Sequence, residues 1–365
     1  MKIKIFFQRE LSNENTLNIN FREYLKKVYY FDQIVEDIDL MDSIQFGMSV
    51  KASQDSDINI WFGSSPEIKF LKGINIVWAR FDSDKLPDSL ISYYKNYAQC
   101  ILVPSQMAKE ALIKRGITEG VVDIIPEVID VFQFHPFLRY SINKSSEPLR
   151  FLSIVDLSKG QGWEDLLEGY KLAFKEIQDV ELIIHLPAKD SLDFSEKKQV
   201  FLKKFESYQF NNAKLIWGQL TSVQLFELFN FADVYVDTNA IDSWNHFTIA
   251  AAATGLPLIL NCYGGPTEFL SKIKDSILEI DSLKKTINDT DYLKNALSDN
   301  SNFDYLLHSK VESIEKQFIT AKLKNENLTN NAFTNSTQIR ECYNWFSLVN
   351  KFLISMKIRG FLNLD

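Results

Sequence analysis

Short apolar runs alternate with amphipathic stretches along most of the chain. Five runs in the first part are predicted to be buried strands, namely Lys2–Phe7, Ile58–Trp61, Ile74–Trp78, Cys100–Val103 and Val121–Ile125. The clearest helix between them is expected to begin after Ser105, a favourable N-cap residue, and to end at Gly116, which suits a C-cap. This alternation predicts a parallel sheet covered by helices on both faces.

A second series begins after a polar stretch between Phe137 and Leu149, which has the composition of a connection between domains. Its predicted strands are Phe151–Val155, Val180–His185, Leu215–Trp217, Val234–Asp237 and Leu258–Asn261, and its first helix carries Leu166, Leu167, Tyr170, Ala173 and Phe174 on one face. We therefore expect an α/β protein with two Rossmann-like, doubly wound domains, over residues 1–140 and 150–340. Such domains bind ligands at the carboxyl ends of their strands, in the cleft where they face each other.

Apolar positions near the C-terminus follow the three-four spacing of one amphipathic helix. The stripe comprises Cys342, Trp345, Phe346, Val349, Phe352, Leu353 and Met356. Because this stripe needs a surface to cover, we expect residues 341–365 to form a helix that crosses back to the N-terminal domain.

Composition excludes several classes of protein. The chain has 365 residues, of which 45% are hydrophobic and 24% charged, as in ordinary globular proteins. A net charge of −8 without a long basic cluster gives no reason to expect a nucleic acid partner. Cys100, Cys262 and Cys342 are too scattered for a disulfide framework or a zinc site. Without a signal-peptide pattern or a long apolar run, we expect a cytoplasmic protein with no transmembrane segment, which leaves peripheral contact with the inner membrane face open.

The most informative stretch runs from Asp237 to Leu270. A strand and a loop precede a helix of small residues, Thr248–Thr254, and the next strand leads into Gly264-Gly265-Pro266-Thr267-Glu268. Adjacent glycines expose backbone N–H groups that can approach an anion without obstruction. A turn of this kind is more often only a connection between a strand and a helix, so the glycines alone do not define a site.

This stretch resembles the donor-site segment of the retaining family 4 glycosyltransferases, which have the GT-B fold. In that family a Glu, seven residues and a second Glu precede "AMACGTP", and a "GGPTE" loop follows the next strand. Gln161-Gly162-Trp163 resembles the start of the family's "KGWDVLLEAY". Upstream, the strings "FETDRIP", "VPS" and "IPEGVDxxxFHP" are similar to Phe81–Pro87, Val103–Ser105 and Ile125–Pro136. The matches keep the family's order over more than half of the chain.

The resemblance implies a metal-independent, retaining transfer of a sugar from a nucleotide-sugar donor, UDP- or GDP-linked, without a cofactor. The acceptor would be a glycan, a lipid-linked sugar or a protein. In the second series, no Asp-x-Asp pair follows a predicted strand, as a manganese-dependent transferase would need.

The resemblance also assigns residues. Asp242 stands at the position of the acid that faces the donor sugar, and His246 follows it in the same loop. The donor-binding positions are Lys159, Gln161, Gly162, Trp244, Asn245, Gly264, Gly265 and Glu268, and the acceptor-side positions are Asp82, Lys85 and Glu127. The alternatives are a packing role for His246 and helix capping for Asp82 and Lys85. His135, His185 and His308 are assigned no chemistry.

Several positions depart from the family. Ala250 stands where the ribose-binding acid belongs, and Asp156 and Gln161 stand where the phosphate-binding Arg and Lys belong. Losing two hydrogen bonds, at about 0.5–1.5 kcal/mol each, lowers nucleotide affinity about tenfold to a hundredfold. Lys159 could supply the missing charge, and a solvated loop lysine is the equal alternative.

These departures leave a second function open. The chain could be a catalytically inactive glycosyltransferase-like partner that binds an active transferase or a glycosylated protein. A third reading, a two-lobed solute-binding protein, is disfavoured because the N-terminus lacks a signal-peptide pattern.

Overall fold

The computed structural model describes residues 3–7, 34–39, 57–62, 73–81, 86–137, 148–157, 162–187, 192–239, 244–286 and 305–362. The chain divides into two compact units. The first comprises Met1–Val128 with Tyr343–Asp365, and the second comprises Ile129–Cys342. The divisions predicted from the sequence lie between residues 140 and 150 and at residue 341.

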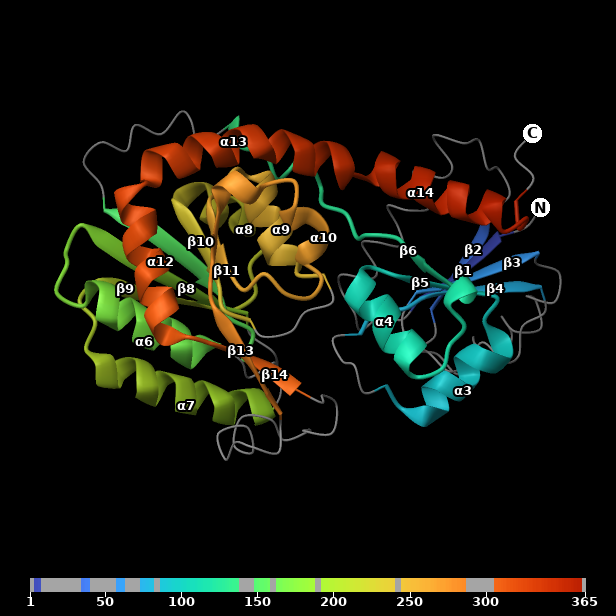
Figure 1. Ribbon diagram of the computed structural model, residues 1–365, viewed down its shortest axis with the longest axis horizontal. Helices are drawn as coiled ribbons and strands as arrows, with labels where there is room; N and C mark the ends of the chain where they lie inside the picture. Colours follow the sequence, from blue (N-terminus) through green and yellow to red (C-terminus); the bar gives the residue numbers. More distant parts are fainter. Residues whose placement is uncertain are drawn as a thin grey trace. The chain divides into compact units, whose positions relative to one another are not determined.

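Each unit holds one six-stranded sheet with helices packed on it (Figure 1). The first unit contains β1 (Ile3–Phe7), β2 (Ile34–Asp39), β3 (Ile58–Phe62), β4 (Ile74–Trp78), α3 (Asp88–Tyr97), β5 (Cys100–Val103), α4 (Gln106–Lys114), β6 (Val122–Ile124) and α14 (Trp345–Ile358). The second unit contains β7 (Leu149–Ile154), α6 (Trp163–Phe174), β8 (Val180–Leu186), α7 (Leu192–Tyr208), β9 (Ala213–Trp217), α8 (Ser222–Phe231), β10 (Val234–Asp237), α9 (His246–Ala253), β11 (Leu258–Leu260), α10 (Thr267–Leu270), β12 (Ile277–Glu279), β13 (Ser282–Thr286), β14 (Tyr305–Ser309), α12 (Val311–Leu323) and α13 (Asn325–Cys342).

Alternating side chains along β3, β4 and β5 give the first unit a core on each face of its sheet. The strands are parallel in the order β2-β1-β3-β4-β5-β6. One face packs against α3 and α4 through a cluster that includes Trp61, Val77, Ile101, Tyr94 and Leu112. The opposite face packs against α14 through a cluster that includes Ile60, Ile76, Leu102, Leu348 and Phe352. The C-terminal helix therefore completes the core of the first unit.

The apolar stripe predicted for one C-terminal helix is divided between two helices. Cys342 ends α13, and Asn344 caps α14 by accepting a hydrogen bond from the backbone N–H of Ser347 at 2.9 Å. Val349 and Phe352 are buried as predicted, whereas Phe346 is 53% exposed, and its predicted burial is wrong. Phe346 lies in the first turn of α14, where side chains tilt toward the helix N-terminus and past the end of the buried stripe.

The second sheet has the order β12-β11-β10-β7-β8-β9, with all neighbours parallel. Counted from β7, this is the order 3-2-1-4-5-6 of nucleotide-binding Rossmann domains. The antiparallel pair β13 and β14 forms a separate two-stranded ribbon. Four strands, β2, β12, β13 and β14, are not predicted from the sequence.

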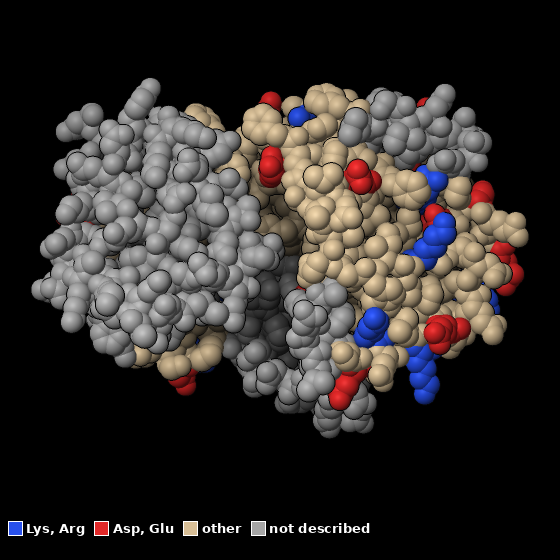
Figure 2. All heavy atoms as spheres, turned by 180° about the vertical axis from the view of Figure 1, so that it is seen from behind, with Lys and Arg blue, Asp and Glu red and all other residues tan. Residues whose placement is uncertain are grey.

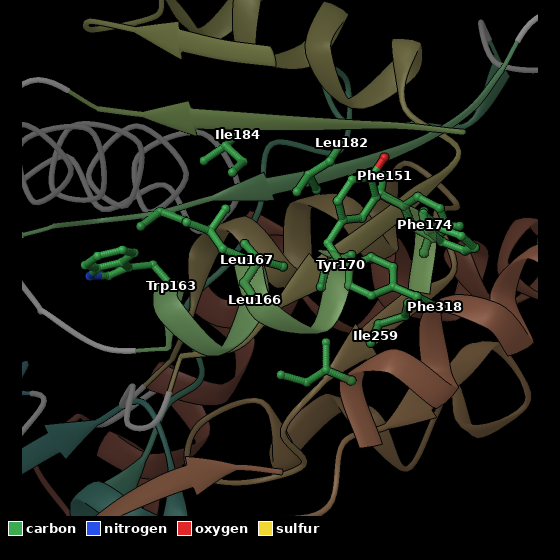
Figure 3. Packing of buried hydrophobic residues seen from close by; sticks show 14 of the residues in the cluster. Phe151, Trp163, Leu166, Leu167, Tyr170, Phe174, Leu182, Ile184, Ile259 and Phe318 are labelled. Atoms are coloured by element: carbon green, nitrogen blue, oxygen red, sulfur yellow. The ribbon is translucent and has the colours of Figure 1, made fainter. Parts of the chain in front are cut away.

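Several aromatic rings pack together in the core between this sheet and α6 and α12 (Figure 3). Phe318 of α12 lies edge-to-face with Phe151 of β7, with ring centroids 4.9 Å apart, and Tyr170 of α6 lies 5.4 Å from Phe318. On the other face of the sheet, Phe229 of α8 packs against Tyr235 at 5.7 Å. Helices thus cover both faces, and the predicted class of two doubly wound α/β units with a C-terminal helix is confirmed.

Candidate functional site

The order of the second sheet marks one place where a ligand site is expected. The chain continues from β7 toward one edge of the sheet and from its neighbour β10 toward the other edge. In open α/β sheets, ligands bind at the carboxyl ends of strands at such a switch point. Here those ends are Ile154 of β7 and Asp237 of β10.

The loops after β7 and β10 touch at this point. The hydroxyl of Thr238 donates a hydrogen bond to the carbonyl oxygen of Gly162 at 2.7 Å. Gly162 has φ +76°, and a Cβ on it would lie 2.6 Å from the carbonyl carbon of Thr238. The position therefore requires glycine, both for its left-handed backbone and for the closeness of the two loops. Lys159 and Gln161, predicted in the same loop, lie outside the described residues.

A buried carboxylate organises the loop between β10 and α9. Asp237, 6% exposed, accepts hydrogen bonds from the hydroxyl of Thr248 at 2.7 Å, from the backbone N–H of Asn239 at 2.9 Å, and from the Asn245 amide. Asn245 has φ +51° and caps α9 by accepting the backbone N–H of Thr248 at 3.0 Å. The start of α9 is thus fixed by hydrogen bonds from the end of β10.

The structure describes two other predicted residues of this loop. Trp244 is fully buried and lies edge-to-face with Phe269 of α10, with ring centroids 5.7 Å apart, so its side chain belongs to the core beneath the loop. His246 is the first residue of α9 and is partly exposed. Asp242 lies outside the described residues.

The glycine loop after β11 turns directly into α10. Gly264 has φ +73°, and its carbonyl oxygen accepts hydrogen bonds from the backbone N–H and hydroxyl of Thr267 at 3.2 and 2.6 Å. The carbonyl oxygen of Gly265 accepts the backbone N–H of Glu268 at 3.0 Å. Both glycines are buried, and Glu268 is partly exposed in the first turn of α10. The chain therefore makes a tight turn at the carboxyl end of β11, which lies at the same edge of the sheet as the ends of β7 and β10.

A second polar cluster joins the loops after β10 and β11 and was not identified in the sequence. The side-chain amide of Asn261, 5% exposed, donates to the carbonyl oxygen of Asn239 at 3.1 Å and to the hydroxyl of Ser309 at 3.1 Å. The hydroxyl of Ser282 donates to the other side-chain atom of Asn261, its carbonyl oxygen. Asn261 so ties the β10 loop to the β13–β14 ribbon. An asparagine directly after a buried strand was the available signal.

Charged and titratable groups near these strand ends are few. Burial, with the nearby Glu279, raises the pKa of the Cys262 thiol to about 12, so this cysteine is not a nucleophile at neutral pH. Acidic and basic side chains are interspersed on the face of the second unit seen in Figure 2. Within the described ranges, no three His, Cys, Asp or Glu side chains gather as metal ligands would.

The acceptor-side prediction concerns the first unit. Glu127 is 4% exposed and pairs with the Arg80 guanidinium, Nε to Oε1 3.5 Å. Asp82 and Lys85 lie outside the described residues.

Ala250 is also placed by the structure. It is 4% exposed in α9, and its carbonyl oxygen accepts the hydroxyl of Thr254 at 2.9 Å. The helix is buried from Thr248 to Ala253 and packs against α13. Its small side chains thus serve close packing.

The chain is similar in fold to several glycosyltransferases. HepE of Anabaena, solved with UDP and glucose, superposes with a TM-score of 0.71 at 10% identity, covering 97% of this chain and 99% of that one. Sucrose-phosphate synthase of Thermosynechococcus elongatus gives 0.68 at 13% identity, covering 99% and 100%. The lipopolysaccharide outer core galactosyltransferase WaaB gives 0.61 at 13% identity, covering 98% and 100%.

No protein-family model and no curated protein matches the sequence. The structural likeness defines the fold: two parallel-sheet α/β domains of the kind found in GT-B glycosyltransferases. None of the helices in the described part of the chain has the length and apolar character to span a bilayer.

Proposed function

We propose that this protein is a glycosyltransferase whose second unit binds a nucleotide-sugar donor. One observation carries the proposal: the fold matches that of HepE, solved with UDP and glucose, over nearly the whole of both chains. The switch point between β7 and β10 supports it, because a contact between loops, a capped helix and a glycine turn meet the same edge of the sheet there.

Each element has a proposed role. The sugar faces the loop that carries Asp242 and His246, and His246 donates a proton to, or hydrogen-bonds, the departing phosphate oxygen. The diphosphate lies against the backbone amides of Gly264 and Gly265, with Lys159 as the nearby cation. Gln161, Gly162, Asn245 and Glu268 complete the donor side, together with Trp244 as the core support of the loop.

The finer chemistry follows the resemblance to the retaining family 4 enzymes. We propose transfer with retention of the anomeric configuration, from a UDP- or GDP-linked sugar, without a metal ion or a separate cofactor. The acceptor is a glycan, a lipid-linked sugar or a protein, and it approaches from the side of Asp82, Lys85 and Glu127.

Titration with nucleotide sugars tests the donor site. UDP-, GDP- and ADP-sugars are added to the purified protein and followed by calorimetry and thermal shift, since ligand at 100 times its Kd stabilises by about 2.7 kcal/mol. In Gly265→Val, a side chain stands between the loop amides and the diphosphate, so we expect binding to be lost. The matched control is Gly120→Val in the first unit, where a Cβ meets nothing within 4 Å and φ is not positive. Equal affinity in the two variants would make the glycine loop only a connection.

The inactive-partner alternative is favoured by one observation, the buried alanine at position 250. Ala250→Glu distinguishes the two functions when it is measured beside Lys159→Ala. Tighter UDP-sugar binding at an unchanged Tm indicates a weakened but working ribose site. No binding in any protein, with the Tm lowered only by the glutamate through overpacking of about 1–3 kcal/mol, indicates the partner protein.

A further inference from the structure

One carboxylate holds both ends of the loop between β10 and α9. The Oδ1 atom of Asp237 accepts the backbone N–H of Asn239, which leaves the strand. Its Oδ2 atom accepts the Asn245 amide and the Thr248 hydroxyl, where the chain enters α9. Two segments separated along the chain are therefore joined at a single side chain.

The segment that leaves β10, Thr238–Asn239, is also hydrogen-bonded to neighbouring loops. The carbonyl oxygen of Asn239 accepts the side-chain amide of Asn261 at 3.1 Å, and the hydroxyl of Thr238 donates to Gly162 at 2.7 Å. Thr238 and Asn239 are thus hydrogen-bonded to Gly162 before α6 and to Asn261 after β11, and Asp237 adds the connection to α9.

The same strand offers a comparison at its opposite end. Asp233 is also buried, at 7% exposure, and its carboxylate accepts the backbone N–H of Arg150 at 2.8 Å. That bond joins two neighbouring strands where they begin. A buried carboxylate is costly unless hydrogen bonds satisfy it, so both aspartates are tied to their surroundings. Only Asp237 is tied to the proposed donor loop.

We propose that Asp237 is a positioning residue of the proposed transferase, acting through Asn245. Its carboxylate holds Asn245 in the left-handed conformation that caps α9, and thereby sets where the helix begins and how its first residue, His246, is presented at the strand ends. Asp237 needs no contact with the donor. The inference rests on the proposed function, because it assigns a role within that site.

The test compares three full-length variants with the wild type. Asp237→Asn replaces one of the two acceptor oxygens by an NH2 donor, so the Asn245 amide and the Asn239 N–H can no longer both be accepted. The variant should lower kcat for sugar transfer or donor hydrolysis about a hundredfold, with a smaller change in KM, since a small displacement of a reacting group has this effect. The double variant Asp237→Asn/Asn245→Asp reverses donor and acceptor and keeps an oxygen to cap Thr248, so kcat should recover. Asp233→Asn is the control and should lower the Tm without lowering kcat of the folded protein.

Each result bears on the proposal. A wild-type kcat in Asp237→Asn overturns the proposal. The proposal is also overturned if the double variant does not recover kcat and Asp233→Asn lowers kcat as much as Asp237→Asn does. A wild type that neither binds nor transfers any sugar overturns the proposed function instead. Hydrogen exchange at the Thr248 amide then decides the positional role. Lost protection in Asp237→Asn, restored in the double variant, supports this role, and unchanged protection overturns it.

Discussion

Gly162→Ala is the most direct perturbation of the contact between the loops after β7 and β10. The substitution adds one carbon atom at a residue with φ +76°. That atom would lie 2.6 Å from the carbonyl carbon and 2.9 Å from the hydroxyl oxygen of Thr238, and it would overlap the carbonyl oxygen. Backbone atoms cannot swing aside as a flexible side chain can, so one of the two loops has to move.

Two costs add in this variant. A left-handed conformation costs an L-residue about 1–2 kcal/mol. Overpacking costs about 1–3 kcal/mol more and includes the strain on the Thr238 to Gly162 hydrogen bond. Gly218→Ala separates the two costs, because Gly218 also has positive φ, +105°, but a Cβ there meets nothing within 4 Å. The difference between the variants therefore measures the close approach alone.

Scanning calorimetry gives the stability arm of the assay. For a unit of this size, 1 kcal/mol shifts the Tm by about 2–4 °C, so Gly162→Ala should melt about 2–12 °C below Gly218→Ala. UDP-sugar titration gives the functional arm, in which affinity falls for Gly162→Ala and stays at the wild-type value for Gly218→Ala. Equal melting temperatures of Gly162→Ala and Gly218→Ala would refute the close contact of the two loops. Equal affinities of these variants for the UDP-sugar would show that donor binding does not depend on this contact.

Two further predictions concern ionisable groups. Burial would raise the pKa of Asp123, but hydrogen bonds from Arg359 and Ser355 outweigh it and hold the pKa below its usual value. Arg359→Met should cost about 1–2 kcal/mol in urea unfolding at pH 7. The difference from wild type should shrink as the pH falls from about 4, the usual pKa of an aspartate in an unfolded chain, through the lowered pKa of folded Asp123. Burial lowers the pKa of His185, despite an opposing bond to the Ile216 carbonyl oxygen. The contribution of neutral His185 to the free energy of unfolding is therefore present above pH about 6.5 and is lost on acidification. From pH 7 to 5, the stability of His185→Leu should therefore fall less steeply than that of the wild type.

The predicted fold follows from apolar runs that are long, buried and bounded by turn residues. Buried strands such as β8 and β10 present side chains to helices on both faces, so most of their residues are apolar. The strands that the apolar pattern does not predict carry other patterns. β2 contains three acidic residues in IVEDID, β12 has only three residues, and β13 reads SLKKT. Strands at an edge or in a ribbon need not be apolar on both faces, so composition does not distinguish them from loops.

The candidate site could be predicted only as far as local motifs extend. Gly162 and the Gly264–Gly265 turn are visible in the sequence because glycine marks positive φ or a close approach of backbone. The Asp237 cluster was not visible, since its partners lie 8 and 11 residues away and meet it only when Asn245 adopts φ +51°. Likewise, Asn261 reaches Ser309 across 48 residues of sequence, a separation that no periodic pattern predicts.

Electrostatics connects the buried Asp237 carboxylate with the choice of residues in the proposed donor site. Asp237 accepts hydrogen bonds from two side chains and one backbone amide, all of them neutral. These bonds stabilise its negative charge but do not neutralise it. Asp156 adds a second acid in the loop after β7. A diphosphate bound at this edge of the sheet would be repelled by both acids, and screening by water is weak where groups are buried. A working donor site therefore needs a cation, which the neighbouring loop offers in Lys159. For this reason Lys159→Ala is the sharper test of phosphate binding, whereas Ala250→Glu, which adds a third acid, tests only the ribose.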